Sequence, residues 1–118
     1  ASAVKTVRAV SASDSSTRAT ALTPTSGKKV RIIGISIATI TATNYVGEVY
    51  FGTGTSVQTN TTKAIWVGNI DNPPAPGTYV QNWPTNGGPV GDVGEVVSIR
   101  TGVDISGGFT IIITYREE

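Results

Sequence analysis

The chain has 118 residues, of which 38% are hydrophobic and 14% are charged, and its formal net charge is +1. This length allows one domain with one hydrophobic core. The near-neutral charge gives no electrostatic basis for binding nucleic acid or an anionic membrane. The sequence contains neither cysteine nor histidine, which excludes disulfides, thiol chemistry, a Ser-His-Asp triad and the usual zinc or copper sites. We therefore expect no cofactor and no metal.

No stretch reaches the roughly 20 apolar residues of a membrane span, and the first ten residues lack the apolar segment of a signal peptide. Ala1 is the residue that removal of an initiator methionine would leave; cleavage of a signal peptide would leave a similar start, and we favour the first. We therefore expect synthesis in a cytoplasm. Asn60-Thr61-Thr62 has the form of a glycosylation sequon, but it carries little weight without a secretory signal.

Short β-branched stretches, bounded by Gly, Pro, Asn or Asp, dominate the chain, and no window has the apolar spacing of a helix. The first expected strand is weak and the sixth is a brief edge strand. The spacing predicts an all-β, single-domain antiparallel β-sandwich or small barrel of seven to eight short strands. Residues 1–16 are expected to form an N-terminal arm or edge strand, and residues 17–118 the sandwich. The expected strands cover residues 4–10, 17–22, 29–43, 45–51, 64–67, 78–81, 95–101 and 108–116.

The strongest expected strand, residues 29–43, is apolar on both faces. Ile33, Ile35 and Ile37 alternate onto one face, and Val30 and Ile32 lie on the other. Such a strand is either buried on both faces or makes a subunit contact with one of them.

A long loop is expected over residues 69–94. Five of the six prolines fall between Pro73 and Pro89, and proline removes a ladder donor and fixes φ, so this segment is loop or, at best, edge strand. Tyr79 and Trp83 argue against disorder, because disordered segments contain few aromatic residues. We expect an ordered loop across one end of the sandwich, stiffened by its prolines.

Carboxylates are the remaining candidates for chemistry. Paired-carboxylate glycoside hydrolysis is formally open, but Asp71, Asp92 and Asp104 lie in turn sequences, where aspartate commonly bonds its own backbone. A calcium site built from Asp92, Glu95 or loop carbonyls lacks the usual DxDxDG spacing. We therefore expect no enzyme activity. The carboxylates are Asp14, Glu48, Asp71, Asp92, Glu95, Asp104, Glu117 and Glu118.

The larger aromatic side chains allow two interpretations. They could form a sugar-stacking platform, or they could pack in the core, at the sandwich edge or at a subunit interface. Because only 7% of the residues are aromatic, we favour packing, with Trp83 as the strongest exception because it lies between prolines. The residues concerned are Tyr45, Tyr50, Trp66, Tyr79 and Trp83.

The order of strands and turns resembles a recurring pattern in small virion proteins of tailed bacteriophages. It runs GKKVRIIGISIATI, YVGEVYFGTGT, a Pro/Gly-rich loop, GDVGEVVSIRTG and GGFTIIITYREE. The resemblance covers residues 20–118 and lies in strand types and turns, while residues 1–18 depart from it. It implies a jelly-roll β-sandwich that serves as a head decoration (cementing) protein or a tail-associated protein.

The resemblance also implies the partners and the location. We expect a homo-oligomer, dimer or trimer, that binds the major capsid protein or another virion protein, does no chemistry and resides in the virion. The alternative is a carbohydrate- or receptor-binding module of a phage tail tip. Partner contacts are expected from the arm, the aromatic loop and the outward residue of the last strand, whose apolar side chain lacks a partner. These residues are Val4, Val7 and Val10 in the arm, Tyr79 and Trp83 in the loop, and Ile112 in the last strand.

Overall fold

The computed structural model describes residues 4–10, 18–39, 45–54, 63–70, 78–84, 86–101 and 109–118. At residues 6–10, 38–39, 45–46, 68–70, 78–79, 101 and 109 it describes the backbone without the side chains. No helix that could cross a membrane occurs among the described residues.

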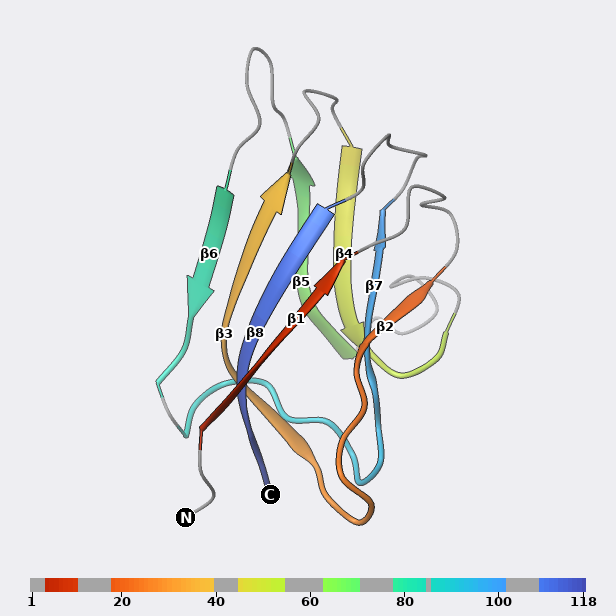
Figure 1. Ribbon diagram of the computed structural model, residues 1–118, viewed down its shortest axis with the longest axis vertical. Helices are drawn as coiled ribbons and strands as arrows, with labels where there is room; N and C mark the ends of the chain where they lie inside the picture. Colours follow the sequence, from red (N-terminus) through yellow and green to blue (C-terminus); the bar gives the residue numbers. More distant parts are fainter. Residues whose placement is uncertain are drawn as a thin grey trace.

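Within these residues, eight strands form two antiparallel four-stranded sheets packed face to face (Figure 1). This is the strand order of a jelly roll, in which two Greek keys share two sheets. The prediction of an antiparallel β-sandwich with a jelly-roll architecture is therefore confirmed. Sheet A has the order β1-β8-β3-β6, with bounds Lys5–Val10, Phe109–Glu117, Val30–Thr39 and Thr78–Asn82. Sheet B has the order β2-β7-β4-β5, with bounds Ala19–Leu22, Val97–Thr101, Tyr45–Phe51 and Ala64–Ile70.

The core consists of β-branched and aromatic side chains from the inner faces of both sheets. Alternation in β8 places Ile111 and Ile113 inward, and both are fully buried, as expected for a strand with one face toward a core. Burying each such side chain stabilises the fold by about 1.5–3 kcal/mol relative to leaving it exposed. The most buried core residues are Val30, Ile32, Ile35, Ile37, Val49, Phe51, Val97, Ile99, Ile111 and Ile113.

A bulge in β3 overturns the prediction of a strand that is apolar on both faces. Ile32 pairs with Tyr115 and Gly34 with Thr114, so Ile33 is an extra residue on β3. A bulge of this kind changes the phase of side-chain alternation. Val30 and Ile32 before the bulge and Ile35 and Ile37 after it all enter the same core, while Ile33 is half-buried. The described side chains of β3, residues 30–37, therefore form no second apolar face for a subunit contact.

The segment after β6, which we call the strap (residues 83–84 and 86–91), returns to the edge of β3. The Ile32 amide donates to the Pro89 carbonyl oxygen at 2.8 Å, and the Gly91 amide donates to the Val30 carbonyl oxygen at 3.0 Å. Strand β6 covers β3 from Gly34 to Ala38, so β6 and the strap together pair with one edge of β3 from Val30 to Ala38.

Glycine is required where the strap crosses β3. A Cβ atom at Gly88 would lie 1.7 Å from the carbonyl oxygen of Ile32, which no side chain can occupy. Within the long loop expected over 69–94, the brief edge strand expected at residues 78–81 is confirmed as β6, and the range also contains the end of β5 and the strap. Residues 77–83 contain no proline, which is why β6 can pair there.

Candidate interaction surfaces

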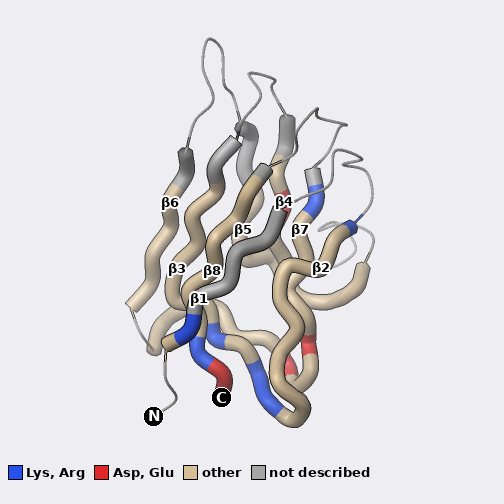
Figure 2. Tube along the Cα trace, viewed as in Figure 1, with Lys and Arg blue, Asp and Glu red and all other residues tan. Residues whose placement is uncertain are grey.

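Charged side chains are unevenly distributed over the sandwich. Figure 2 shows them gathered at the end where the two termini lie, with a further group around β2 and β7. Strands β5 and β6, at the same side of the two sheets (Figure 1), contain no charged residue. We call the surface formed by Ala64–Ile70 and Thr78–Asn82 the uncharged side.

A buried carboxylate ties the N-terminal strand to the C-terminal strand. Glu117, which is 7% exposed, accepts a hydrogen bond from the Lys5 ammonium at 2.5 Å. It also accepts hydrogen bonds from the backbone amide of Thr25 and, at 2.9 Å, from the Thr25 hydroxyl. The Lys5 ammonium, followed by the two Thr25 donors, lowers the pKa of the Glu117 carboxyl from 4.5 to about 2. Because the folded state favours the ionised carboxylate, the stability of the fold depends on pH.

The last residue closes a second ionic network at the same end. Glu118 accepts a two-pronged hydrogen bond from Arg31, at 2.6 Å from Nε and 3.2 Å from Nη2. Arg116 adds a contact of 2.7 Å to the same carboxylate and donates to the Asn86 side chain at 2.8 Å. Arg31 also donates to the carbonyl oxygens of Asn86 and Gly88. This network joins β3, β8 and the strap.

Sheet B carries a row of polar side chains on the face opposite the core. Glu48 pairs with Arg100 at 2.8 Å, and Ser98 donates to the Gly52 carbonyl oxygen and accepts from Arg18 at 3.0 Å. Glu48, Tyr50 and Ser98 are all buried. Burial, followed by the nearby Glu48 carboxylate, raises the pKa of the Tyr50 phenol. The satisfied hydrogen bonds indicate a structural role for this row, because buried polar groups destabilise a fold when they are unpaired.

The described carboxylates are engaged in ion pairs. Asp92 and Glu95 lie close together, but the Lys63 ammonium sits between them, 2.8 Å from Asp92 and 3.3 Å from Glu95. Both carboxylates are therefore paired with the same lysine. Among the described residues no group of three or more His, Cys, Asp or Glu side chains is arranged to bind a metal. Asp14, Asp71 and Asp104 lie outside the described residues.

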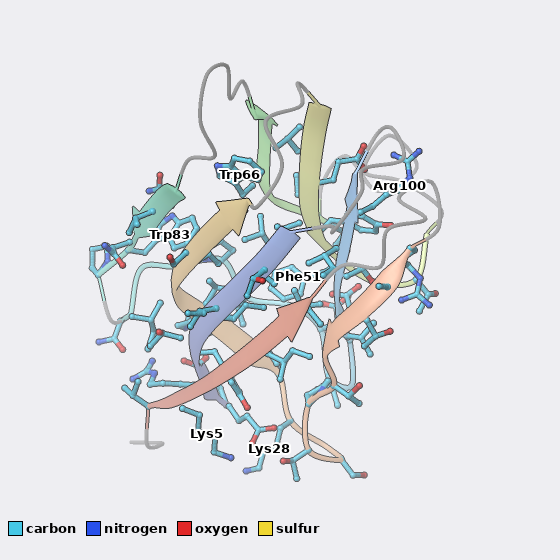
Figure 3. All side chains as sticks on the ribbon, turned by 45° about the horizontal axis from the view of Figure 1, so that its top comes forward. Lys5, Lys28, Phe51, Trp66, Trp83 and Arg100 are labelled. Atoms are coloured by element: carbon cyan, nitrogen blue, oxygen red, sulfur yellow. The ribbon has the colours of Figure 1, made fainter. Side chains whose placement is uncertain are left out.

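The aromatic residues do not assemble into one exposed platform in the described structure. Tyr50 is fully buried, and Trp66 and Trp83 are partly buried and pack against the core. Figure 3 shows these two tryptophans on the same side of the sandwich, away from Arg100. The side chains of Tyr45 and Tyr79 lie outside the described part of the structure.

The N-terminal arm is largely part of sheet A. Val4 is 56% exposed, and residues 5–10 form β1, which pairs along its length with β8. In this register Val7 stands opposite Ile113 and Val10 opposite Thr110, whereas the side chains of both valines lie outside the described residues. Strand β1 therefore lies at an edge of the sandwich.

Ile112 is half-buried on the outer face of sheet A. Its register neighbours are Arg8 on β1 and Ser36 on β3, so it does not belong to a continuous apolar patch. A single exposed hydrophobic residue needs no partner to explain it. Together with the bulge in β3, this removes the observations from which the sequence predicted Ile112 as a subunit contact.

The uncharged side carries exposed apolar residues that the sequence analysis did not single out. Val80 on β6 is 63% exposed and Val67 on β5 is 49% exposed. The signal was present in the sequence, since two neighbouring strand segments, residues 64–70 and 78–82, contain no Lys, Arg, Asp or Glu. Compared with known proteins, the chain matches no family model and no curated protein sequence.

Proposed function

We propose that this protein is a structural virion protein of a tailed bacteriophage, which binds the head shell as a decoration protein and stabilises it through protein-protein contacts. The observation that carries the proposal is a jelly roll in which β5 and β6, two strands at the same side of the two sheets, contain no charged residue. Jelly rolls include viral capsid and lectin domains, and the choice between these classes comes from the surface rather than from the fold.

The surface supports assembly with other proteins. Charged residues are depleted at the centres of protein interfaces, and each strand of the uncharged side presents an exposed valine, Val80 on the outer face of sheet A and Val67 on the outer face of sheet B. The ionic networks at the end with both termini hold the two terminal strands. A domain of this kind can bury surface on two neighbouring capsid subunits at once. Because it then binds only the assembled shell, its binding stabilises the shell against dissociation.

The proposed partner is the major capsid protein or a neighbouring virion protein, and the proposed location is the assembled virion. We propose no catalytic activity, because each described carboxylate that could serve as an acid or base is already held by a lysine or arginine. Those carboxylates are Glu48, Asp92, Glu95, Glu117 and Glu118.

Co-sedimentation with head shells of the phage that encodes the protein tests this function. We expect binding that saturates at a fixed number of copies per shell. In parallel, tryptophan fluorescence is titrated with a broad panel of glycans, since Trp66 and Trp83 are both partly exposed. Absence of shell binding together with a saturable fluorescence change would overturn the proposal in favour of a carbohydrate-binding module.

A further inference from the structure

The two sheets have four edge strands, and three of them carry features that discourage pairing with another chain. Strand β1 contains Lys5 and Arg8, and charged residues on an edge oppose strand addition. Strand β2 has four residues and a register shift against β7. Strand β5 has a register shift against β4, next to Val49. Short edges and bulges are the usual protection against unwanted pairing.

Within the described part of the chain, β6 is the one edge strand that lacks all of these features. Its five residues, TYVQN, contain no charge and no proline. They pair with β3 in an uninterrupted register from Gly34–Asn82 to Ala38–Thr78. A regular, uncharged edge is the type to which another strand adds most readily.

The hydrogen bonding of Trp83 shows which backbone groups of β6 face outward. The Trp83 amide donates to the Ile33 carbonyl oxygen at 2.8 Å, so this residue directs its backbone toward β3. In an antiparallel ladder alternate residues point to opposite neighbours. Gln81 therefore also faces β3, and Val80 presents both its N–H and its C=O groups to the open edge.

The sequence of β6 is complementary to itself when two copies run antiparallel. With a two-fold axis at Val80, the two Val80 residues stand opposite each other, and Thr78 stands opposite Asn82 of the second copy. No pair brings like charges together, and the central pair is apolar and exposed in the single chain. Such an isologous contact closes after two subunits.

We propose that the β6 edge is a homodimer interface, in which β6 of two copies pairs antiparallel about Val80 and joins the two A sheets into one eight-stranded sheet. The partner is a second copy of this chain, and the inference stands independently of the function proposed above. Because the paired edge is only five residues long, it buries less surface than an obligate interface, so the dimer forms reversibly as the protein concentration rises.

Two substitutions at Val80 test the interface while sparing the fold. Val80→Pro removes an N–H that β3 does not use, at a position where an edge strand tolerates proline. Val80→Lys places a positive charge opposite an identical charge in the dimer. Ile112→Lys serves as the matched control, because it puts the same charge on the outer face of sheet A, away from the edge.

The measurement is light scattering after size-exclusion chromatography over a wide range of protein concentration, with circular dichroism to verify folding. We expect the wild type and Ile112→Lys to approach twice 12.2 kDa at high concentration, and both folded Val80 variants to remain at the single-chain mass. A wild type that stays monomeric at millimolar concentration would overturn the interface. So would a dimer that survives both Val80 substitutions or one that only Ile112→Lys dissociates.

Discussion

The ammonium group of Lys5 lies 2.5 Å from the carboxylate of Glu117, although 112 positions separate the two residues in the sequence. The contact joins the first strand to the last strand at the end of the sandwich that holds both termini (Figure 1). Thr25 donates two further hydrogen bonds to the same carboxylate. Glu117 is therefore a junction of β1, β8 and the turn that precedes β3.

This junction predicts a loss of stability in acid. The pKa of Glu117 falls from 4.5 to about 2 in the fold, so the folded state favours the ionised carboxylate. Its contribution is complete above about pH 5 and is lost as the pH falls toward 2. We expect Glu117→Gln to lower the melting temperature by several degrees at pH 7. The difference in melting temperature between the variant and the wild type should become smaller as the pH falls from 5 to 2.

Lys5→Met provides the matching control for this prediction. Because the two side chains share one interaction, the effects of Lys5→Met and Glu117→Gln on the free energy of unfolding should add to more than the effect of the double variant. Thermal denaturation over a pH series gives the free energy of unfolding of the wild type, the two single variants and the double variant. Strict additivity, or a pH profile that Glu117→Gln leaves unchanged, would contradict the role assigned to the pair.

The close passage of the strap over β3 predicts that Gly88 cannot be replaced. Alanine at this position would put its Cβ 1.7 Å from the Ile32 carbonyl oxygen, and the backbone of either the strap or β3 would have to move. We expect Gly88→Ala to cost at least about 3 kcal/mol in the free energy of unfolding, measured by urea denaturation.

The adjacent glycine is the control for Gly88. At Gly87 an added Cβ would meet only the Pro84 side chain, at 3.4 Å, and Gly87→Ala should change the free energy of unfolding by less than about 1 kcal/mol. Equal effects of the two substitutions would show that the strap does not approach β3 as described.

The bulge in β3 predicts different effects of substituting two adjacent isoleucines. Ile32 is fully buried in the core, so Ile32→Ala should cost about 2–5 kcal/mol. Ile33 is the bulged residue and is half-buried, so Ile33→Ala should cost less than about 1.5 kcal/mol. Chemical denaturation of both variants measures the difference. If Ile33→Ala were the more damaging substitution, β3 would follow the unbroken alternation that its sequence predicts.

The sequence predicted the sandwich because its strands carry alternating β-branched residues between turn residues. This pattern is local, since it can be recognised within ten consecutive residues. It did not predict the bulge at Ile33, because the extra residue is defined only by pairing with Tyr115 and Thr114 of β8. The requirement for Gly88 was hidden for the same reason, since the Ile32 carbonyl that it approaches is 56 positions away.

The fold is confirmed, whereas the contact residues expected from the sequence stay predictions. Trp83 is an aromatic residue between prolines, which is typical of a contact residue, but it packs against the core. Its amide donates to the Ile33 carbonyl oxygen, and this hydrogen bond holds it beside β3. The β6 edge has no motif. Its signal is the absence of charge, proline and bulge from one edge strand, and this becomes informative only when the strand order shows which strands are edges.

We propose that the protein stabilises a head shell by docking on it. The most direct test is the disruption temperature of purified shells, followed by light scattering as increasing amounts of the protein are added. The account predicts that this temperature rises and reaches a plateau at a fixed ratio of protein to capsid subunits. A disruption temperature that remains unchanged over the whole titration would contradict it.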